Sequence, residues 1–277
     1  MKHERIYLNP DDDRVYIDTY IANLGKCRDA MLVIPGGGYG SVCTDREGEP
    51  VALDFFAKGY NAFVLNYRVG REGDVFPKQL LDAAAAMIYI RKNAEKLCIN
   101  PSRVFAVGFS AGGHLCGCLA TMFDYNEVLE AYGDDYMLVR PTAAILSYPV
   151  TVLTDDTHIN SFKNLLGRPS GEFTEDEISK FSLDRAATPD AAPMFLWHTA
   201  EDQLVPPVGT ITFAHALAVL GVKYKLSMYP YGPHGLALAN EVTRCGNPAM
   251  VQPLAATWTC EADEWMKTLP DYPENKK

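Results

Sequence analysis

The sequence predicts an α/β fold in which helices flank a mostly parallel sheet. Short apolar runs alternate with longer segments of helical periodicity, most of these runs end in a glycine-rich or acidic turn, and a Gly-x-Ser-x-Gly pattern occupies residues 108–112. Alternating strands and helices form parallel βαβ units, whose ligands bind at the carboxyl ends of the strands. At 277 residues, the chain is expected to form a single domain, residues 1–277, with one large core.

Composition excludes several classes of partner. The chain has 35 acidic and 25 basic residues, a formal charge of −10, so we expect no nucleic-acid partner. No apolar run approaches the roughly 20 residues of a membrane helix, and no membrane association is expected. The first residues, MKHERIYLNPDDDR, lack the apolar core of a secretory signal, so the expected location is the cytoplasm.

The cysteines give no sign of a metal site. All seven are scattered, without a Cys-x-x-Cys pair or histidines at matching spacing. We therefore expect buried free thiols and no bound metal. Cys116 and Cys118 point to different sides of the helix in which they are predicted to lie, which favours packing.

The first predicted strands lead to a glycine-rich loop. Residues 15–22 alternate and residues 30–34 are apolar, with a plausible turn at 23–26, so the two runs form a hairpin or the first sheet strands. The second run ends in Pro-Gly-Gly-Gly-Tyr-Gly at residues 35–40. Successive glycines present backbone N–H groups without side chains, which favours an oxyanion loop over a flexible turn. The spacing does not match a dinucleotide fingerprint.

The next segments continue the alternation. A helix is predicted to open at Glu49-Pro50 and to close at Gly59, because proline suits the first turn of a helix and glycine its end. Residues 61–67 are an apolar strand. Residues 76–97 have helical periodicity and a basic end, and 103–109 form the next strand.

Ser110 lies at the sharp turn between that strand and a following helix. A serine there must adopt a strained backbone with neighbouring chain close on both sides, so Gly108 and Gly112 provide space where a Cβ would collide. The pattern predicts that Ser110 is a nucleophile.

After a strand at 143–148 the alternation is interrupted. Residues 151–192 are polar and are interpreted as a short insertion over the active site. Thr174 and the acidic residues after it predict a capped helix, which favours ordered cover, and a role as a lid is a hypothesis. The remaining predicted elements are a strand at 193–199, a helix at 208–220, a strand at 223–229 and a final helix within 250–269.

A serine hydroxyl needs a base to take its proton and an acid to orient that base. Asp202 and His234 each follow a predicted strand, which gives the chain order Ser110, Asp202, His234 along one strand-end rim. These are the predicted catalytic residues. The alternatives for the acid are Glu201, Asp155 and Asp156.

The negative oxygen of a tetrahedral intermediate needs fixed donors. The N–H of Ala111, directly after the nucleophile, is one, and the N–H of Gly37 or Gly38 is the other. No chemistry is assigned to the other histidines, which are His3, His114, His158, His198 and His215.

With these residues in place, the chain resembles the α/β-hydrolase superfamily over nearly its whole length, and within it the acetyl xylan esterases and related carbohydrate esterases. The matching segments are PGGGYG at 35–40, REGEP at 46–50, LNYRV at 65–69, GFSAGGH at 108–114, AEDQLVP at 200–206 and GPHG at 232–235. The resemblance implies a sheet of about eight mostly parallel strands and no cofactor. Pro35 departs from the histidine that many relatives have there.

The resemblance implies a serine esterase that removes acetyl or another short acyl group from carbohydrates such as xylo-oligosaccharides. Tyr39, Glu47 and Glu49 near the glycine loop are candidates for contacts with sugar hydroxyls, although Glu49 also suits the start of its helix. The expected partner is a small-molecule or oligosaccharide ester. The alternatives are a general short-chain carboxylesterase, a serine peptidase of related fold, and a non-catalytic binding protein, against which the complete serine, aspartate and histidine set argues.

Overall fold

The computed structural model describes residues 1–154 and 157–272 of the chain. Its centre is an eight-stranded sheet with the order β1-β2-β4-β3-β5-β6-β7-β8. All pairs from β4 to β8 are parallel, and the pairs β1–β2 and β2–β4 are antiparallel. The strands are β1 Lys2–Tyr7, β2 Tyr16–Ile21, β3 Arg28–Ile34, β4 Asn61–Asn66, β5 Ile99–Phe109, β6 Ala144–Ser147, β7 Met194–Thr199 and β8 Tyr224–Tyr229. The predicted mostly parallel α/β sheet is confirmed.

The antiparallel end of the sheet differs from the predicted hairpin. β2 and β3 are both strands, but β4 lies between them, so they do not pair with each other. The antiparallel neighbour of β2 is β1, from Lys2↔Ile21 to Tyr7↔Tyr16. β1 lies at the edge of the sheet and has no fully buried residue, so its sequence carries little of the apolar signal that predicts a strand.

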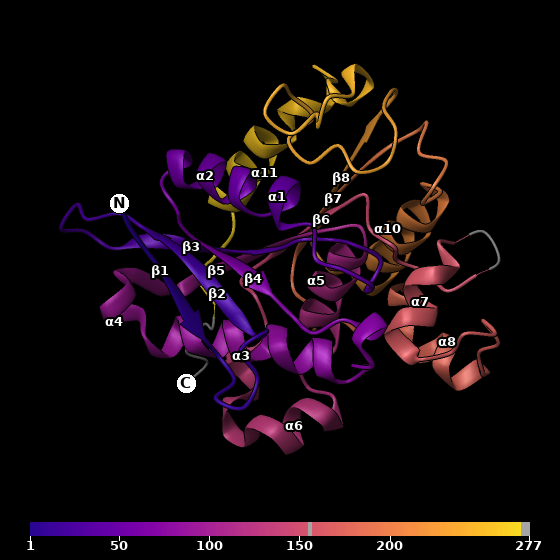
Figure 1. The fold of residues 1–277 in the computed structure, drawn as a ribbon, viewed down its shortest axis with the longest axis horizontal. Helices are drawn as coiled ribbons and strands as arrows, with labels where there is room; N and C mark the ends of the chain where they lie inside the picture. Colours follow the sequence, from indigo (N-terminus) through magenta and orange to yellow (C-terminus); the bar gives the residue numbers. More distant parts are fainter. Residues whose placement is uncertain (155–156, 273–277) are drawn as a thin grey trace.

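Helices cover both faces of the sheet (Figure 1). α2 and α11 pack on one face, whereas α3, α5 and α10 pack on the other. The helices are α1 Thr44–Glu47, α2 Glu49–Lys58, α3 Lys78–Lys92, α4 Ala94–Leu97, α5 Ala111–Thr121, α6 Asn126–Tyr132, α7 Ile159–Leu166, α8 Glu175–Phe181, α9 Leu183–Ala186, α10 Val208–Leu220 and α11 Trp258–Lys267. Among the described residues, none of these helices has the length and apolar character needed to cross a membrane.

Two predicted helices are shorter than expected. The segment 76–97 divides at Asn93 into α3 and α4, and the Asn93 side chain donates to the Tyr89 carbonyl, a local bond that competes with helix continuation. The final helix begins only at Trp258, after two short 3₁₀ turns. Trp258 is fully buried and stacks on Trp197 of β7 with ring centroids 5.3 Å apart.

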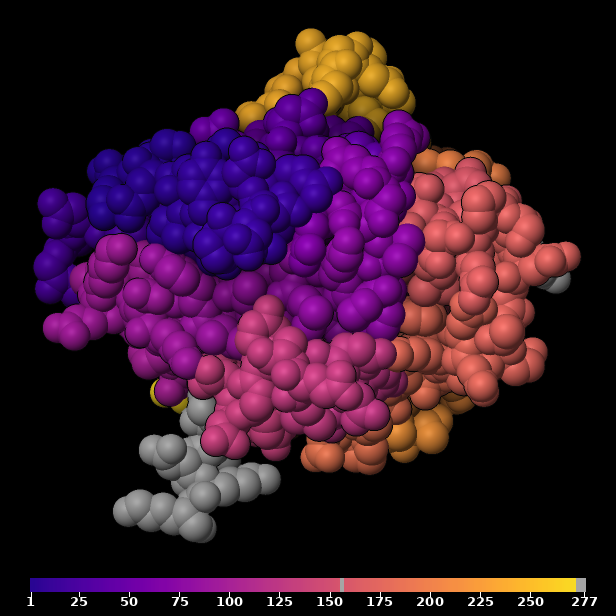
Figure 2. All heavy atoms as spheres, turned by 60° about the horizontal axis from the view of Figure 1, so that its bottom comes forward, coloured from indigo at the N-terminus to yellow at the C-terminus, as the bar shows by residue number. Residues whose placement is uncertain are grey.

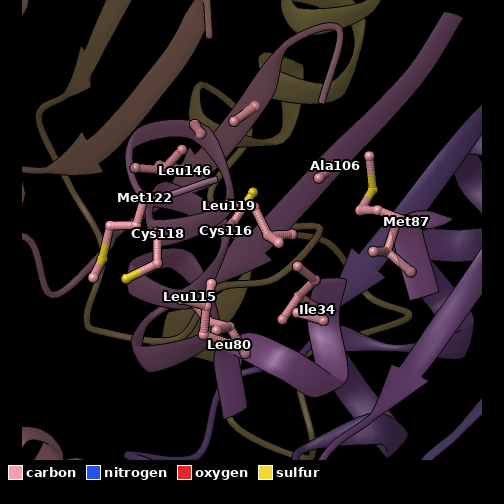
Figure 3. Packing of buried hydrophobic residues seen from close by; sticks show 14 of the residues in the cluster. Ile34, Leu80, Met87, Ala106, Leu115, Cys116, Cys118, Leu119, Met122 and Leu146 are labelled. Atoms are coloured by element: carbon pink, nitrogen blue, oxygen red, sulfur yellow. The ribbon is translucent and has the colours of Figure 1, made fainter. Parts of the chain in front are cut away.

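The helix behind Ser110 is buried throughout. All residues of α5 are buried, and Leu115, Cys116 and Leu119 pack with Ile34 and Leu146 from the neighbouring strands (Figure 3). A helix apolar on all sides belongs inside a protein, so α5 is a fixed support for the turn that precedes it.

The cysteines only partly match their prediction. Cys116 and Cys118 are buried in the core, as expected. Cys27, Cys245 and Cys260 are exposed, so the prediction of buried thiols is wrong for these three, whose segments lie at the surface in loops or on the outer side of α11.

Residues 157–192, which we call the cover segment, form α7, α8 and α9. α9 packs against α10, and α7 and α8 lie on the side of the molecule opposite β1 (Figure 1). In the space-filling view these residues form one connected region of the surface, in direct contact with the rest of the molecule (Figure 2). The predicted capping box is present, because the Thr174 side chain accepts from the Glu177 N–H and the Glu177 carboxylate accepts from the Thr174 N–H. Phe162 and Leu183 are fully buried in the main core, so the cover segment is packed against the rest of the protein.

Candidate active site

Ser110 occupies the turn between β5 and α5 with φ of 53° and ψ of −118°. This left-handed backbone is strained for a residue with a side chain. A Cβ on Gly108 would lie 2.1 Å from the Gly112 carbonyl oxygen, and one on Gly112 would lie 2.3 Å from the Ile34 oxygen. The turn is held because Ser110 donates its N–H to the Ser147 carbonyl of β6 at 3.0 Å.

The structure brings Ser110, Asp202 and His234 together at the carboxyl ends of β5, β7 and β8. His234 Nε2 lies 2.9 Å from Ser110 Oγ, and His234 Nδ1 lies 2.6 Å from Asp202 Oδ2. Because an ionised carboxylate only accepts, Nδ1 carries the proton, and Nε2 is left to accept from the Ser110 hydroxyl. Ser110 is 8% exposed, which leaves it reachable from outside.

The alternative acids are not in this chain of hydrogen bonds. Glu201 is exposed, and its carboxylate accepts from the Gly232 N–H at 3.0 Å. Asp155 and Asp156 lie outside the described residues.

Asp202 is buried and receives donors on both carboxylate oxygens. Oδ1 accepts the N–H groups of Leu204 and Val205 at 3.0 and 2.9 Å, and Oδ2 accepts from His198 Nε2 at 3.0 Å as well as from His234. Burial alone would raise the pKa of this carboxyl, but the hydrogen bonds from the two imidazoles outweigh it and hold the pKa well below its usual range. Asp202 therefore stays ionised beside His234.

His198 is a neighbour of the site that sequence reasoning missed. It is the last residue but one of β7, is fully buried, and lies with Nδ1 2.8 Å from Thr210 Oγ1 of α10. Its Nε2 faces two acceptors, the Asp202 carboxylate and the Val205 carbonyl, each 3.0 Å away, so Nε2 carries a proton. The available signal was the spacing His198-x-x-x-Asp202 across a strand end, which places both side chains in one turn.

The glycine loop after β3 presents backbone donors beside Ser110. The Gly36 carbonyl accepts from Cys43 N, and the Gly37 carbonyl accepts from Gly40 N, all within the loop. The C=O and N–H of a trans peptide point in opposite directions, so the N–H groups of Gly37 and Gly38 point away from the loop interior.

The loop also lies directly against Ser110. A Cβ on Gly36 would lie 3.0 Å from Ser110 Cβ. The Ala111 N–H opens α5, where the first N–H groups of a helix have no partner within it. Among the described residues, the N–H groups of Gly37, Gly38 and Ala111 have no hydrogen-bond acceptor.

The family model described as BD-FAE matches residues 17–217. The chain belongs to this family. A solved acetyl ester-xyloside bifunctional hydrolase from Caldicellulosiruptor lactoaceticus is similar in structure, with a TM-score of 0.81 and 32% identity over 96% of each chain. A carboxylesterase from Lactobacillus plantarum also has a TM-score of 0.81, at 27% identity over 96% of this chain and 97% of its own.

Curated relatives include longer proteins. The endo-1,4-beta-xylanase B of Butyrivibrio fibrisolvens is 39% identical over 225 residues, 80% of this chain and 34% of that protein. The acetylxylan esterase of Xylanibacter ruminicola is 31% identical over 209 residues, 74% of this chain and 40% of that protein. The chain thus spans about a third to two fifths of the length of these relatives. The predicted resemblance is confirmed, and the chain has the α/β-hydrolase fold of these relatives.

Two of the three residues predicted to contact sugar are turned inward in this family member. Tyr39 is buried, and its hydroxyl bonds His114 Nδ1 at 2.7 Å. Glu47 is 2% exposed, with both carboxylate oxygens bonded inside the protein. These two predictions are wrong. The Tyr39 hydroxyl is occupied by His114, and the short helix α1 lies beneath the loop and so buries the Glu47 carboxylate. Glu49 is exposed at the first residue of α2, the position that the alternative prediction assigned to it.

His114 holds the loop from inside. Its Nδ1 accepts from the Tyr39 hydroxyl, and its Nε2 donates to the Phe181 carbonyl of α8 at 2.9 Å. Burial lowers the pKa of His114 to about 4, so the ring is neutral at neutral pH. These contacts are structural, in keeping with the absence of any chemical role for His114 in the sequence prediction.

The cover segment reaches the glycine loop through two further side chains. Asn164 of α7 donates to the Gly38 carbonyl at 2.8 Å. His158, before α7, is half-buried with its ring beside Gly38, where an added Cβ would lie 3.6 Å from His158 Cε1. Burial and the neighbouring His234 lower the pKa of His158. Neither contact could be predicted from the sequence, because the segment folds over the site from far along the chain.

Proposed function

We propose that the protein is a serine esterase in which Ser110 is the nucleophile, His234 the general base and Asp202 the residue that orients and supports it. The observation that carries this proposal is the unbroken set of hydrogen bonds from Ser110 Oγ through His234 to Asp202, 2.9 and 2.6 Å long, beside unpaired loop N–H groups. The family and the solved esterases of the same fold support it.

The proposed reaction proceeds through an acyl-enzyme. Ser110 Oγ attacks the ester carbonyl while His234 Nε2 takes its proton, and the resulting oxyanion accepts from the Ala111 N–H and from Gly37 or Gly38. Collapse breaks the bond to the alcohol oxygen, which receives the proton from His234. Water, activated by the same histidine, then releases the acid and restores Ser110.

The proposed substrate is a short acyl ester, most simply an acetyl ester, carried by a carbohydrate such as a xylo-oligosaccharide. The names of the acetylxylan esterase and of the acetyl ester-xyloside hydrolase support this choice. The inward orientation of Tyr39 and Glu47 removes two of the predicted sugar contacts, so the carbohydrate preference rests on the relatives. A general short-chain carboxylesterase is the alternative that the L. plantarum structure favours.

Replacement of the nucleophile tests the chemistry. Ser110→Ala should lower turnover of p-nitrophenyl acetate by up to about a millionfold, because the attacking oxygen is removed. The matched control is Ser170→Ala, which removes an exposed hydroxyl in the cover segment and should leave turnover unchanged. Undiminished activity of Ser110→Ala would refute the assignment.

A second measurement tests the substrate class. Acetate release from acetylated xylo-oligosaccharides should exceed release of acid from simple alkyl esters and from feruloyl esters, compared as kcat/KM. Equal values for all three would favour the general carboxylesterase. Cleavage of peptide substrates at a comparable rate would favour the peptidase.

A further inference from the structure

A buried carboxylate that the reaction does not use lies beneath the glycine loop. Glu47 Oε2 accepts the Gly36 N–H at 2.8 Å. The contact is close, because a Cβ on Gly36 would lie 2.9 Å from this oxygen. The other carboxylate oxygen, Oε1, accepts from the hydroxyl of Tyr148 at 2.8 Å. One carboxylate therefore receives a donor from each of two separate segments.

Tyr148 continues this connection to the loop that carries His234. Its hydroxyl accepts the Ala237 N–H at 2.9 Å while it donates to Glu47. The Tyr148 ring also packs edge-on against the His234 ring, with centroids 5.0 Å apart. Burial and the Glu47 charge raise the pKa of Tyr148 well above its usual value, which keeps the hydroxyl protonated as a donor.

The location of Glu47 makes these two hydrogen bonds important. The carboxylate is 2% exposed, and its closest cationic group among the described residues is Arg46, 3.7 Å away and half-buried. A buried carboxylate is costly unless its oxygens receive hydrogen bonds. If either donor is lost, the free-energy cost of burying the charge is no longer offset by two hydrogen bonds. The Glu47 carboxylate therefore favours a structure in which Gly36 and Tyr148 both stay bonded to it.

We propose that Glu47 is a positioning residue that joins the oxyanion loop to the loop of His234 through Tyr148. Glu47 holds the Pro35–Gly36 peptide, which directly precedes the peptides that carry the Gly37 and Gly38 N–H groups, and Ala237 lies three residues after His234. The relay therefore sets the distance between the oxyanion donors and the general base. This inference rests on the proposed esterase function and adds residues that touch no substrate.

Glu47→Gln preserves the shape but not the hydrogen bonding. Gly36 N–H and the Tyr148 hydroxyl are both donors, and an amide has only one acceptor oxygen, so one of these two donors loses its acceptor and that end of the relay is weakened or reversed in direction. A displacement of about 1 Å at an active site lowers rates on the order of 100-fold, so we expect kcat to fall about 10- to 100-fold. The KM should stay within about threefold, because the interaction is needed in the transition state.

The experiment compares Glu47→Gln, Tyr148→Phe and the double variant with a matched control, Asp45→Asn, an exposed carboxylate on the same short helix. Tyr148→Phe keeps the ring beside His234 and removes only the hydroxyl. Active sites are counted by stoichiometric reaction with a fluorophosphonate, so that inactive protein does not enter kcat. The affinity for an alkyl boronic acid, whose serine adduct places a negative oxygen among the loop donors, is the second measurement.

The expected result is a parallel loss of kcat per active site and of boronate affinity in both single variants, with Asp45→Asn like the wild type. The double variant should be no worse than the more damaged single variant within about threefold, because both substitutions break one relay. Unchanged boronate affinity in Glu47→Gln, or losses that multiply in the double variant, would overturn the inference. A wild-type protein that neither hydrolyses esters nor reacts with the fluorophosphonate would instead overturn the proposed function.

Discussion

The site has two sides, one around Asp202 and one around the glycine loop. Each contains a buried carboxylate and a buried histidine, but the hydrogen-bond partners of these groups differ between the two sides. On the side of His234, the proposed general base, Asp202 and His198 bond each other directly at 3.0 Å. On the side of the glycine loop, Glu47 bonds an amide and a hydroxyl, whereas His114 bonds a tyrosine hydroxyl and a carbonyl. On the Asp202 side the carboxylate and the imidazole are hydrogen-bonded to each other, whereas on the loop side Glu47 and His114 each bond other groups.

This difference separates two tasks. Four donors surround Asp202, two amides and two imidazoles, so its charge is stabilised and available to His234. Within residues 1–154 and 157–272, His114 has no carboxylate among its hydrogen-bond partners, and burial lowers its pKa to about 4. The first side thus supports charge next to a moving proton, whereas the second holds backbone in place.

The largest expected effect on this comparison comes from Asp202→Asn. The amide can present its NH₂ to His234 Nδ1 and favour the wrong tautomer, so kcat should fall on the order of ten-thousandfold. Steady-state kinetics on p-nitrophenyl acetate measure this loss. If Asp202→Asn were silent and Asp155→Asn damaging, the acid would be the residue outside the described part of the chain.

A smaller effect is expected from the second imidazole on Asp202. His198→Asn keeps an amide near Thr210 but cannot reach Asp202, whereas His198→Gln places an amide donor near the position of Nε2. A hydrogen bond to a charged group contributes about 1.5–3 kcal/mol, so His198→Asn should lose roughly ten- to a hundredfold in kcat/KM. His198→Gln should recover most of this loss.

Recovery in one variant separates positioning from general damage. His198→Gln returns a donor to Asp202 Oδ2, whereas His198→Asn does not. Equal losses of kcat/KM in both variants would show that His198 only fills space.

The positions of Ser110, Asp202 and His234 could be predicted because parallel strands bring their carboxyl ends to one edge. Each residue follows an apolar run, and local sequence is enough to locate such a run. The catalytic roles of the three residues stay a prediction, supported by their distances. The mostly parallel sheet and the capping box of α8 were predictable for the same local reason.

The orientation of Glu47 and Tyr39 could not be predicted in this way. An acidic residue in the first turn of a helix is typical of the surface, and only the path of the glycine loop over α1 buries this one. The separation of β2 from β3 likewise depends on where β4 inserts. The role of His198 was hidden because its partners include Thr210, twelve residues further along the chain.

The smallest expected effect is on the pH dependence of the unfolding free energy, and it comes from His114, the neutral histidine on the loop side. In the unfolded chain a histidine binds a proton near pH 6.5, whereas folded His114, fully buried, does so only near pH 4. Below pH 6.5 the unfolded state therefore gains protons that the folded state does not, so stability is lost as pH falls through this window. Relative to His114→Gln, the wild type should lose about 3 kcal/mol of unfolding free energy between pH 7 and pH 4.

Denaturant unfolding at several pH values gives the slope of the unfolding free energy against pH. A destabilisation by the substitution that is the same at every pH does not change this slope. The matched control is His215→Gln on the exposed face of α10, whose slope should follow the wild type. An identical slope for His114→Gln and the wild type would mean that His114 gains a proton in the folded protein. The Tyr39 hydroxyl would then no longer have an acceptor there, and the loop side would hold a charged imidazole without a carboxylate partner among the described residues.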